Sequence, residues 1–288
     1  MSERSIKSMK KYLLFLTILI ALSCSNSDKN INSSIPISEG VFELVQTFGG
    51  SKNDVAKSII STLDGGFAVL GYTQSIDGDV TGKINEDYDL WVLKFNSEAL
   101  LERNKTYGGS GDDRGSHLIQ TSDGGYALIG YSDSLDGDVT SNNGNRDFWM
   151  VKIDAVGAIT WQKSFGYAGV DEGISVIETS GNHYLLSGVI DVTASEGEGN
   201  IGRYSSKHAG GDYWSIKINS TGDLIWSRFY GGSFTDIPAG IVENVNSDLI
   251  TIGGSDSNDI DITNNKGSYD FWVVKSNTSG DIIWEKSY

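Results

Sequence analysis

The chain has 288 residues, of which 36 are glycine and one is cysteine, and its formal net charge is −16 at pH 7. Such an acidic chain repels phosphate backbones and anionic headgroups, which argues against a nucleic-acid partner and against electrostatic binding to membranes. One cysteine excludes an intramolecular disulfide, so stability must come from packing.

Residues 1–23 are typical of a bacterial signal peptide and are left out of the fold. Four cationic residues precede an apolar segment, Tyr12 to Leu22, that is too short to span a bilayer. Ala21-Leu22-Ser23-Cys24 resembles the lipobox of bacterial lipoproteins, which implies acylation of Cys24. We therefore expect an outer membrane lipoprotein of the cell envelope, periplasmic or surface-exposed. An ordinary secretory peptide with an incidental cysteine is the alternative.

Residues 24–40 are polar and rich in serine and asparagine, which is typical of a flexible tether. Residues 1–23 contain four basic residues and one acidic residue, so the remaining chain has a net charge of −19. This charge suits an extracytoplasmic domain held to the membrane through its lipid anchor alone.

A repeat of about sixty residues fills the chain from residue 41 onward. Its clearest sign is an Asp-aromatic-Trp or Asp-Leu-Trp strand that ends in lysine, at residues 89–94, 147–152, 212–217 and 270–275. The copies span residues 49–107, 108–165, 166–230 and 231–288. A fixed period of this size indicates a supersecondary unit that buries its apolar surface against its neighbours.

Each copy predicts four short strands in the same order. An aromatic-Gly-Gly stretch and an Asp precede the first strand, and Asp64-Gly65-Gly66 is the first of the turns that join strands one and two. A Gly follows near the end of strand two, and a polar loop leads to the Asp-x-Trp strand. Strand four carries the other tryptophans, Trp161, Trp226 and Trp284.

Four antiparallel strands per copy predict an all-β fold, a β-propeller-like array of four four-stranded blades. The Gly-Gly stretches, the spaced Asp and the stretches Gly71–Ser75 and Gly130–Ser134 resemble the bacterial seven-bladed beta-propeller repeat family, over residues 41–288. That resemblance implies the propeller fold and no particular activity. A β-solenoid is the rival architecture, but its rungs are usually shorter than these copies.

The array is predicted to be an incomplete ring. Strand four occurs five times, beginning with Val41–Phe48, whereas strands one to three occur four times. A closed ring would contain equal numbers of each strand. We therefore expect an open arc, either part of a longer array or closed by a partner, with an exposed apolar blade face.

The loop between strands two and three holds the candidate metal ligands. Two carboxylates stand two residues apart in three copies: Asp77 and Asp79, Asp136 and Asp138, and Asp259 and Asp261. Carboxylate oxygens suit Ca²⁺, the one cofactor that the sequence suggests. Asp and Ser also form hydrogen-bonded turns without a metal, and this second interpretation stays open.

The same loop of copy three is longer, and in place of the Asp pair it carries Ala194 and Glu196. It also contains Arg203, Lys207 and His208, which are cationic candidates in an acidic chain. Insertions in repeat proteins often lie on the binding face, so this loop is a candidate contact for a glycan or protein ligand. A functionally neutral loop is the alternative.

The lysine that recurs at the end of each Asp-x-Trp strand predicts a structural contact. Lys94, Lys152, Lys217 and Lys275 occur among apolar neighbours, where a lysine is costly unless it is paired. Each copy also carries Asp at fixed places, so we expect an ion pair that recurs from blade to blade.

Taken together, the sequence predicts a lipid-anchored extracytoplasmic propeller that serves as a binding or scaffold module. The alternative is a propeller enzyme, a polysaccharide or peptide hydrolase or lyase, with its site in the central channel. No catalytic residue can be assigned, because the three histidines occupy different repeat positions and the acids mostly recur. The position shared by Ser58, His117, Ser175 and Gly240 is where a channel site would be sought.

Overall fold

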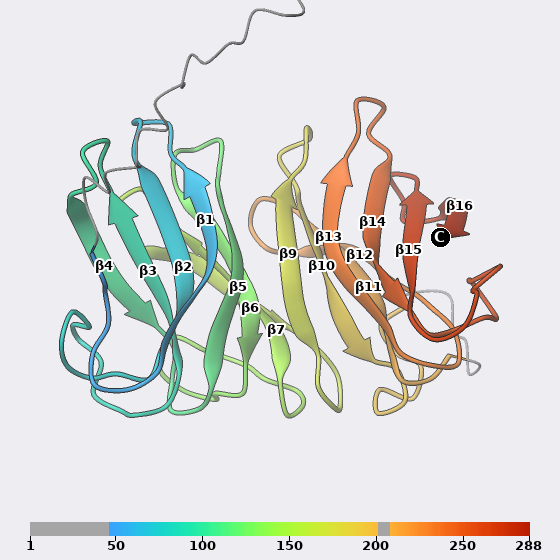
Figure 1. Cartoon of the computed structure of the whole chain (residues 1–288), viewed down its shortest axis with the longest axis horizontal. Coiled ribbons are helices and arrows are strands. Elements are labelled where there is room, and N and C mark those ends of the chain that lie inside the picture. The colour runs from blue at the N-terminus through green and yellow to red at the C-terminus, as the bar shows by residue number, and fades with distance from the viewer. Residues whose placement is uncertain (1–45, 201–207) are drawn as a thin grey trace, which may run out of the picture. The chain divides into compact units, whose positions relative to one another are not determined.

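The computed structural model describes residues 46–200 and 208–288. Packing divides the chain into residues 1–47 and 48–288, and the second unit contains every described strand. Those strands form four antiparallel sheets, each a simple meander of four neighbours (Figure 1). The described residues contain no helix, hence no helix able to cross a membrane.

Each sheet lies within one copy of the repeat and is called a blade. Blade one has β1 (Asp54–Ser61), β2 (Phe67–Thr73), β3 (Asp89–Phe95) and β4 (Leu101–Tyr107). Blade two has β5 (Asp113–Gln120), β6 (Tyr126–Ser132), β7 (Asp147–Ile153) and β8 (Ile159–Phe165). Blade three has β9 (Glu172–Glu178), β10 (Tyr184–Asp191), β11 (Gly211–Ile218) and β12 (Leu224–Tyr230). Blade four has β13 (Asp236–Glu243), β14 (Leu249–Ser255), β15 (Asp270–Ser276) and β16 (Ile282–Ser287).

The predicted strands and hairpins are confirmed, most of them to within a few residues. Gly65 and Gly124 take the positive φ that the turn requires, 84° and 83°. Strand two runs about two residues past the predicted glycine in each blade. Most of the surplus strand Val41–Phe48 lies outside the described residues, and its described part, residues 46–48, is not a strand.

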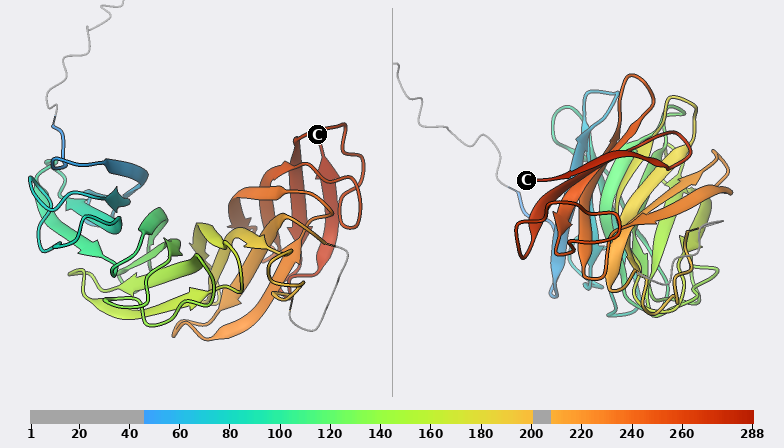
Figure 2. Two further views of the ribbon diagram at one scale, coloured as in Figure 1. Left: turned by 90° about the horizontal axis from the view of Figure 1, so that it is seen from below. Right: turned by 90° about the vertical axis from the view of Figure 1, so that its right-hand side faces the viewer.

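In blades two, three and four, the first strand packs on the first three strands of the preceding blade. Thus β5 packs on β1–β3, β9 on β5–β7, and β13 on β9–β11. Figure 2 shows the sheets of residues 48–288 following one another in chain order. No substantial packing joins a strand of blade one to a strand of blade four within the described residues. The array is therefore open, as the sequence predicted.

The apolar core lies in the junctions between blades. Leu70 and Leu90 of blade one bury with Leu118 and Trp149 of blade two. The second junction repeats this pattern with Ile129, Phe148, Val176 and Trp214. Both faces of blade two are therefore covered, which explains why β7 is buried along its whole length. In blade one, the side of β3 that faces away from blade two is buried by Val80, Phe48 and Phe67 instead.

The predicted ion pair recurs in three blades. Lys94 Nζ lies 2.8 Å from Asp64, Lys152 Nζ 2.8 Å from Asp123, and Lys275 Nζ 2.7 Å from Asp248, each Asp belonging to the hairpin turn of the same blade. The turn of blade three, Gly181-Asn182-His183, contains no acid, and no ion pair of Lys217 is found within the described residues. Pairing of the lysine with an Asp is therefore found in three blades, but the partner is an Asp of the hairpin turn and not one of the two Asp positions that every copy carries.

Candidate functional site

The Asp-x-Asp loops hold the Gly-Gly stretch of their own blade. In blade two, Asp136 Oδ1 accepts the Ser110 amide hydrogen at 2.7 Å and Asp138 Oδ2 accepts that of Gly108 at 3.2 Å. Corresponding bonds join Asp77 to Ser51, Asp79 to Gly49, Asp259 to Ser233 and Asp261 to Gly231. All six predicted residues therefore act as clamps on a backbone loop.

This geometry accounts for the six residues through turn chemistry, the second interpretation given above. One oxygen of each carboxylate already accepts an amide hydrogen, as expected of an Asp that stabilises a turn. Among residues 46–200 and 208–288, no three or more His, Cys, Asp or Glu side chains are grouped to hold a metal ion. The calcium hypothesis stays a prediction, for which a test is given below.

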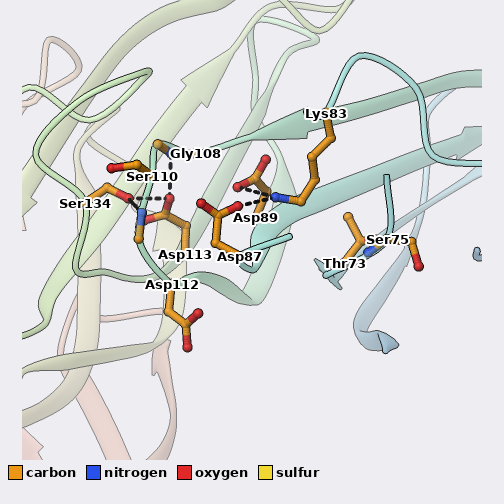
Figure 3. A network of polar contacts seen from close by, with 12 residues as sticks. Thr73, Ser75, Lys83, Asp87, Asp89, Gly108, Ser110, Asp112, Asp113 and Ser134 are labelled. Atoms are coloured by element: carbon orange, nitrogen blue, oxygen red, sulfur yellow. Dashed lines mark hydrogen bonds and ion pairs between the residues drawn. The ribbon is translucent and has the colours of Figure 1, made fainter. Parts of the chain in front are cut away.

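A buried Asp at the start of the first strand completes the clamp. Asp113 Oδ2 accepts the Gly109 amide hydrogen at 2.7 Å and the Ser134 hydroxyl hydrogen at 2.8 Å (Figure 3). Burial raises the pKa of Asp113 to about 7, against these hydrogen bonds and one from Ser132. Asp54 and Asp236 accept the equivalent amide and serine bonds in blades one and four.

A second acid reaches the same point from the preceding blade. A Cβ added to Gly108 would stand 2.5 Å from Asp89 Oδ1 and 2.6 Å from Asp113 Oδ2, so only glycine fits between the two carboxyl groups. Gly231 is enclosed in the same way by Asp212 and Asp236. Two acids, one from each blade, therefore meet at a glycine where blades join.

The acid near the start of strand three is held by a backbone amide four residues earlier in blades two and four, and by a side chain in blades one and three. Asp147 Oδ2 accepts the Asn143 amide hydrogen at 2.7 Å, and Asp270 Oδ2 accepts that of Lys266 at 2.5 Å. In blade one the partner is Lys83, which is almost fully buried and lies 2.5 Å from Asp87 and 3.1 Å from Asp89 (Figure 3). Burial raises the pKa of Asp89 to about 6 although Lys83 opposes the shift.

A pocket of about 290 Å³ opens over the first junction. Side chains of Lys83, Asp87, Asp89, Asp136 and Asp138 line it together with the Gly108–Ser110 backbone. Its many acceptor oxygens suit hydroxyl or cationic groups. Asp89, which lines the pocket, and the neighbouring Asp113, which does not, both have raised pKa values and could act as general acid and base. An equivalent pair, Asp212 and Asp236, recurs at the third junction. A role of these acids in joining blades therefore explains them better than catalysis does.

In blade three, the partner of the strand-three acid, Asp212, is His208. Its Nδ1 lies 2.6 Å from Asp212 Oδ2, and its Nε2 lies 3.9 Å from Asp261. Its ring packs edge-on against Phe229, with centroids 4.8 Å apart. Arg203 and Lys207, the other residues of the candidate ligand loop, lie outside the described residues. The one described member of the group is therefore buried in the third junction.

The proposed channel position also takes part in the junctions. His117 Nδ1 accepts the Val176 amide hydrogen at 3.3 Å, and Ser58 Oγ accepts that of Leu118 at 3.4 Å. Burial lowers the pKa of His117, which keeps the accepting nitrogen free of a proton. This histidine holds a neighbouring blade, and its geometry assigns it no chemical step.

Sequence reasoning missed a set of hydrogen bonds between blades. Gln120, Glu178 and Glu243 end their inner strands and accept amide hydrogens from the preceding hairpin turn, at Leu63, Ser122 and Ser180, over 2.7–2.8 Å. On strand four, Trp161 donates to the Ser220 carbonyl and Trp226 to that of Thr278, each in the next blade. Their recurrence at the repeat period was the available signal.

No family model and no curated protein sequence matches the chain. A solved protein of unknown function from Bacteroides caccae is similar with a TM-score of 0.37 and 10% identity, over 81% of each chain. A Synechocystis apocarotenoid oxygenase variant gives a TM-score of 0.43 and 12% identity over 81% of this chain. The match covers 49% of that enzyme, so this chain spans about half its length. Likenesses of this size carry no functional argument.

Proposed function

We propose that this chain is a binding or scaffold module, held to the cell envelope through Cys24, which docks a further blade-like sheet on blade four. The anchor is supported by the lipobox-like sequence. The docking role is supported by one observation. Blade four exposes an apolar face, whereas the corresponding faces of the other three blades are buried.

This end face consists of Val242, Ile252, Phe271, Trp284 and Tyr288, all exposed. Phe271 is 52% exposed, whereas Leu90, Phe148 and Tyr213 at the same position are fully buried. Ile252 is likewise exposed where Leu70 and Ile129 are buried. An apolar patch of this kind is typical of an interaction site.

The second of the three existing junctions shows what such a surface accepts, whereas the third has Pro238 in place of the first-strand glycine. A Cβ added to Gly188 of blade three would stand 2.5 Å from Phe148 Cζ, and one added to Gly173 would stand 2.5 Å from Ile129. The incoming blade therefore presents glycine to the large side chains of the preceding blade. Phe271 and Ile252 of blade four repeat the large side chains and require the same glycines.

The polar half of the junction is also exposed on blade four. Val245 is fully exposed, and its counterparts Leu63, Ser122 and Ser180 each donate an amide hydrogen to the next blade. Trp284 is 43% exposed, and its counterparts donate to a carbonyl of the next blade. The expected occupant is thus a blade with glycines on its first two strands and Gln or Glu at the end of the first.

Blade one of a second copy fits this description poorly. It has Ala56 where blades two and three have Gly115 and Gly173, and Ser61 where they have Gln120 and Glu178. The extra Cβ would crowd Ile252, and the shorter serine would not reach the turn. A partner blade that carries the inner-blade residues is therefore favoured over head-to-tail pairing of two copies.

A five-blade chain tests this proposal. Residues 108–165 are fused after Tyr288, which brings Gly115 and Gln120 to the end face. The added blade should cover Phe271, raise the melting temperature by roughly 3 °C or more, and reduce self-association. Fluorine spectroscopy on labelled Phe271 would report its burial.

The matched control is the same fusion with Gly115→Leu and Gln120→Ala in the appended copy only. It should fail to cover Phe271 while leaving the first four blades folded. If both fusions leave Phe271 exposed and the melting temperature unchanged, the end face is not a blade-docking surface and the proposal fails.

A further inference from the structure

A tryptophan on strand four fills each junction that follows blades two and three. Trp161 donates its indole hydrogen to the Ser220 carbonyl at 3.1 Å, and its ring lies 5.9 Å from that of Tyr184. Trp226 donates to the Thr278 carbonyl at 2.9 Å. Blade one has Arg103 at this position, so the first junction lacks the indole.

A pocket of about 280 Å³ lies at the corresponding place in the first junction. Its walls include Tyr107, Tyr126, Ile153 and Gly157. Tyr126 stands where Tyr184 lies beside Trp161, with the two rings tilted by 60°, and Gly157 stands where Gly222 approaches that indole. The side chains that surround an indole at the second junction therefore surround a pocket at the first.

The pocket is cationic, in contrast to the chain as a whole. Arg103 and Lys105 both line it, and no ion pair of either is found within the described residues. Lys105 donates a hydrogen bond to the Gly157 carbonyl at 2.8 Å and lies over the Tyr107 ring. Glu102 and Lys94 also line the pocket, but they pair with each other at 3.0 Å.

We infer that this pocket binds a small anion built on a flat aromatic ring, such as an indole carboxylate. The ring occupies the place that Trp161 fills one junction later, between apolar walls and Tyr126. The carboxylate pairs with Arg103 and Lys105, which form no ion pair within residues 46–200 and 208–288, although Asp154 interacts with Lys105 at longer range. Arg103 also reaches the phenol of Tyr126, whose pKa is raised by burial against a hydrogen bond from Arg103.

The site differs from the end face of blade four in position, ligand and charge. It also differs from the acidic pocket on the loops of the first junction. Failure of the blade-docking proposal would leave it unaffected, because the two are tested with different variants and different probes.

The test titrates the purified chain with indole-3-acetate in a calorimeter. Saturable binding of one molecule per chain is expected, and uncharged 3-methylindole should bind at least about 10-fold more weakly because it lacks the carboxylate. Lys105→Met should weaken indole-3-acetate about 10-fold. The matched Lys163→Met variant, at the junction where Trp161 fills the space, should leave the affinity unchanged.

Arg103→Trp is the decisive variant, because it restores the residue that the repeat uses elsewhere. Its indole should occupy the pocket, abolish binding and raise the melting temperature. Arg103→Met removes the charge without filling the space and should bind the neutral probe as well as the parent chain does. The inference is overturned if indole-3-acetate shows no saturable binding up to about 5 mM, or if it binds the folded Arg103→Trp variant equally well.

Discussion

His208 Nδ1 lies 2.6 Å from Asp212 Oδ2, and both side chains are buried at the junction of blades three and four. Burial lowers the pKa of His208 and raises the pKa of Asp212 to about 9. The pair is therefore neutral, with the carboxyl proton donated to the imidazole. Asp236 and Asp261 keep a proton on the pair because they disfavour a further negative charge there. They also raise the pKa of His208, but burial of the imidazole outweighs this effect.

This pair predicts a pH dependence of stability. Below pH 6.5 the unfolded chain keeps one proton on His208, and the folded pair keeps one on Asp212. Between pH 6.5 and about 9 the unfolded chain loses its proton whereas the folded pair retains it. The free energy of unfolding should therefore fall as pH rises through this window, by up to about 1.4 kcal/mol per pH unit.

Asp212→Asn is the matched variant for that window. Asparagine can donate to the same imidazole nitrogen but does not titrate, so this part of the decline should disappear. Urea unfolding at several pH values measures the effect. Equal slopes in the two proteins between pH 6.5 and 9 would show that the pair does not hold the proton.

The lysine column predicts an asymmetry between the two halves of an ion pair. Lys152 is almost fully buried, whereas its partner Asp123 is mostly exposed. Asp123→Ala leaves a buried ammonium without its partner and should cost about 1–3 kcal/mol, whereas Lys152→Met should cost less. Chemical denaturation measures both. A larger loss for Lys152→Met would contradict this account.

The Lys152–Asp123 pair also predicts a loss of stability at low pH. Desolvation would raise the pKa of Asp123, but hydrogen bonds from Lys152 and Thr121 lower it to about 2. A lowered carboxyl pKa contributes stability above the ordinary value of 3.8 and loses it as the pH falls toward 2. Asp123→Asn should therefore flatten the acid limb of the stability profile.

The inter-blade acceptor at the end of β9 gives a further prediction. Glu178 accepts hydrogen bonds from the Ser122 amide and hydroxyl, each at 2.7 Å. Glu178→Ala should destabilise the chain by about 1 kcal/mol, whereas Glu178→Gln should be nearly neutral because Gln120 does the same work at the first junction. Thermal unfolding ranks the three proteins, and identical melting temperatures would remove this contact from the account.

The calcium question has a direct test in the loop of blade two. The clamp interpretation predicts that Asp136→Asn weakens the bond to the Ser110 amide and lowers the melting temperature without any metal. Millimolar Ca²⁺ should then leave both proteins unchanged. A calcium-dependent rise in the parent chain that Asp136→Asn abolishes would instead support the metal site.

Local pattern predicted the blades well, because the signals lie within one copy. Asp64-Gly65-Gly66 requires a turn wherever it occurs, and a lysine among apolar residues, such as Lys94, requires a partner nearby. The candidate site was harder to predict because it forms between copies. Nothing local to Asp89 shows that Asp113 faces it across a junction, and Asp136 resembles a metal ligand until its amide partner is known. Arg103 was informative only by comparison with the tryptophans at the same repeat position.

Sedimentation velocity over a dilution series tests the central claim most directly. An open array with the end face of blade four uncovered predicts weak association of copies through this apolar face, weak because blade one lacks the glycines that the face requires. The apparent mass of the chain should therefore rise only at high concentration, and Phe271→Asp should restore a monomer at every concentration. The matched Leu63→Asp variant, an exposed position on blade one outside the end face, should leave the association unchanged. A monomer at all concentrations, with Phe271 protected from solvent, would contradict the account.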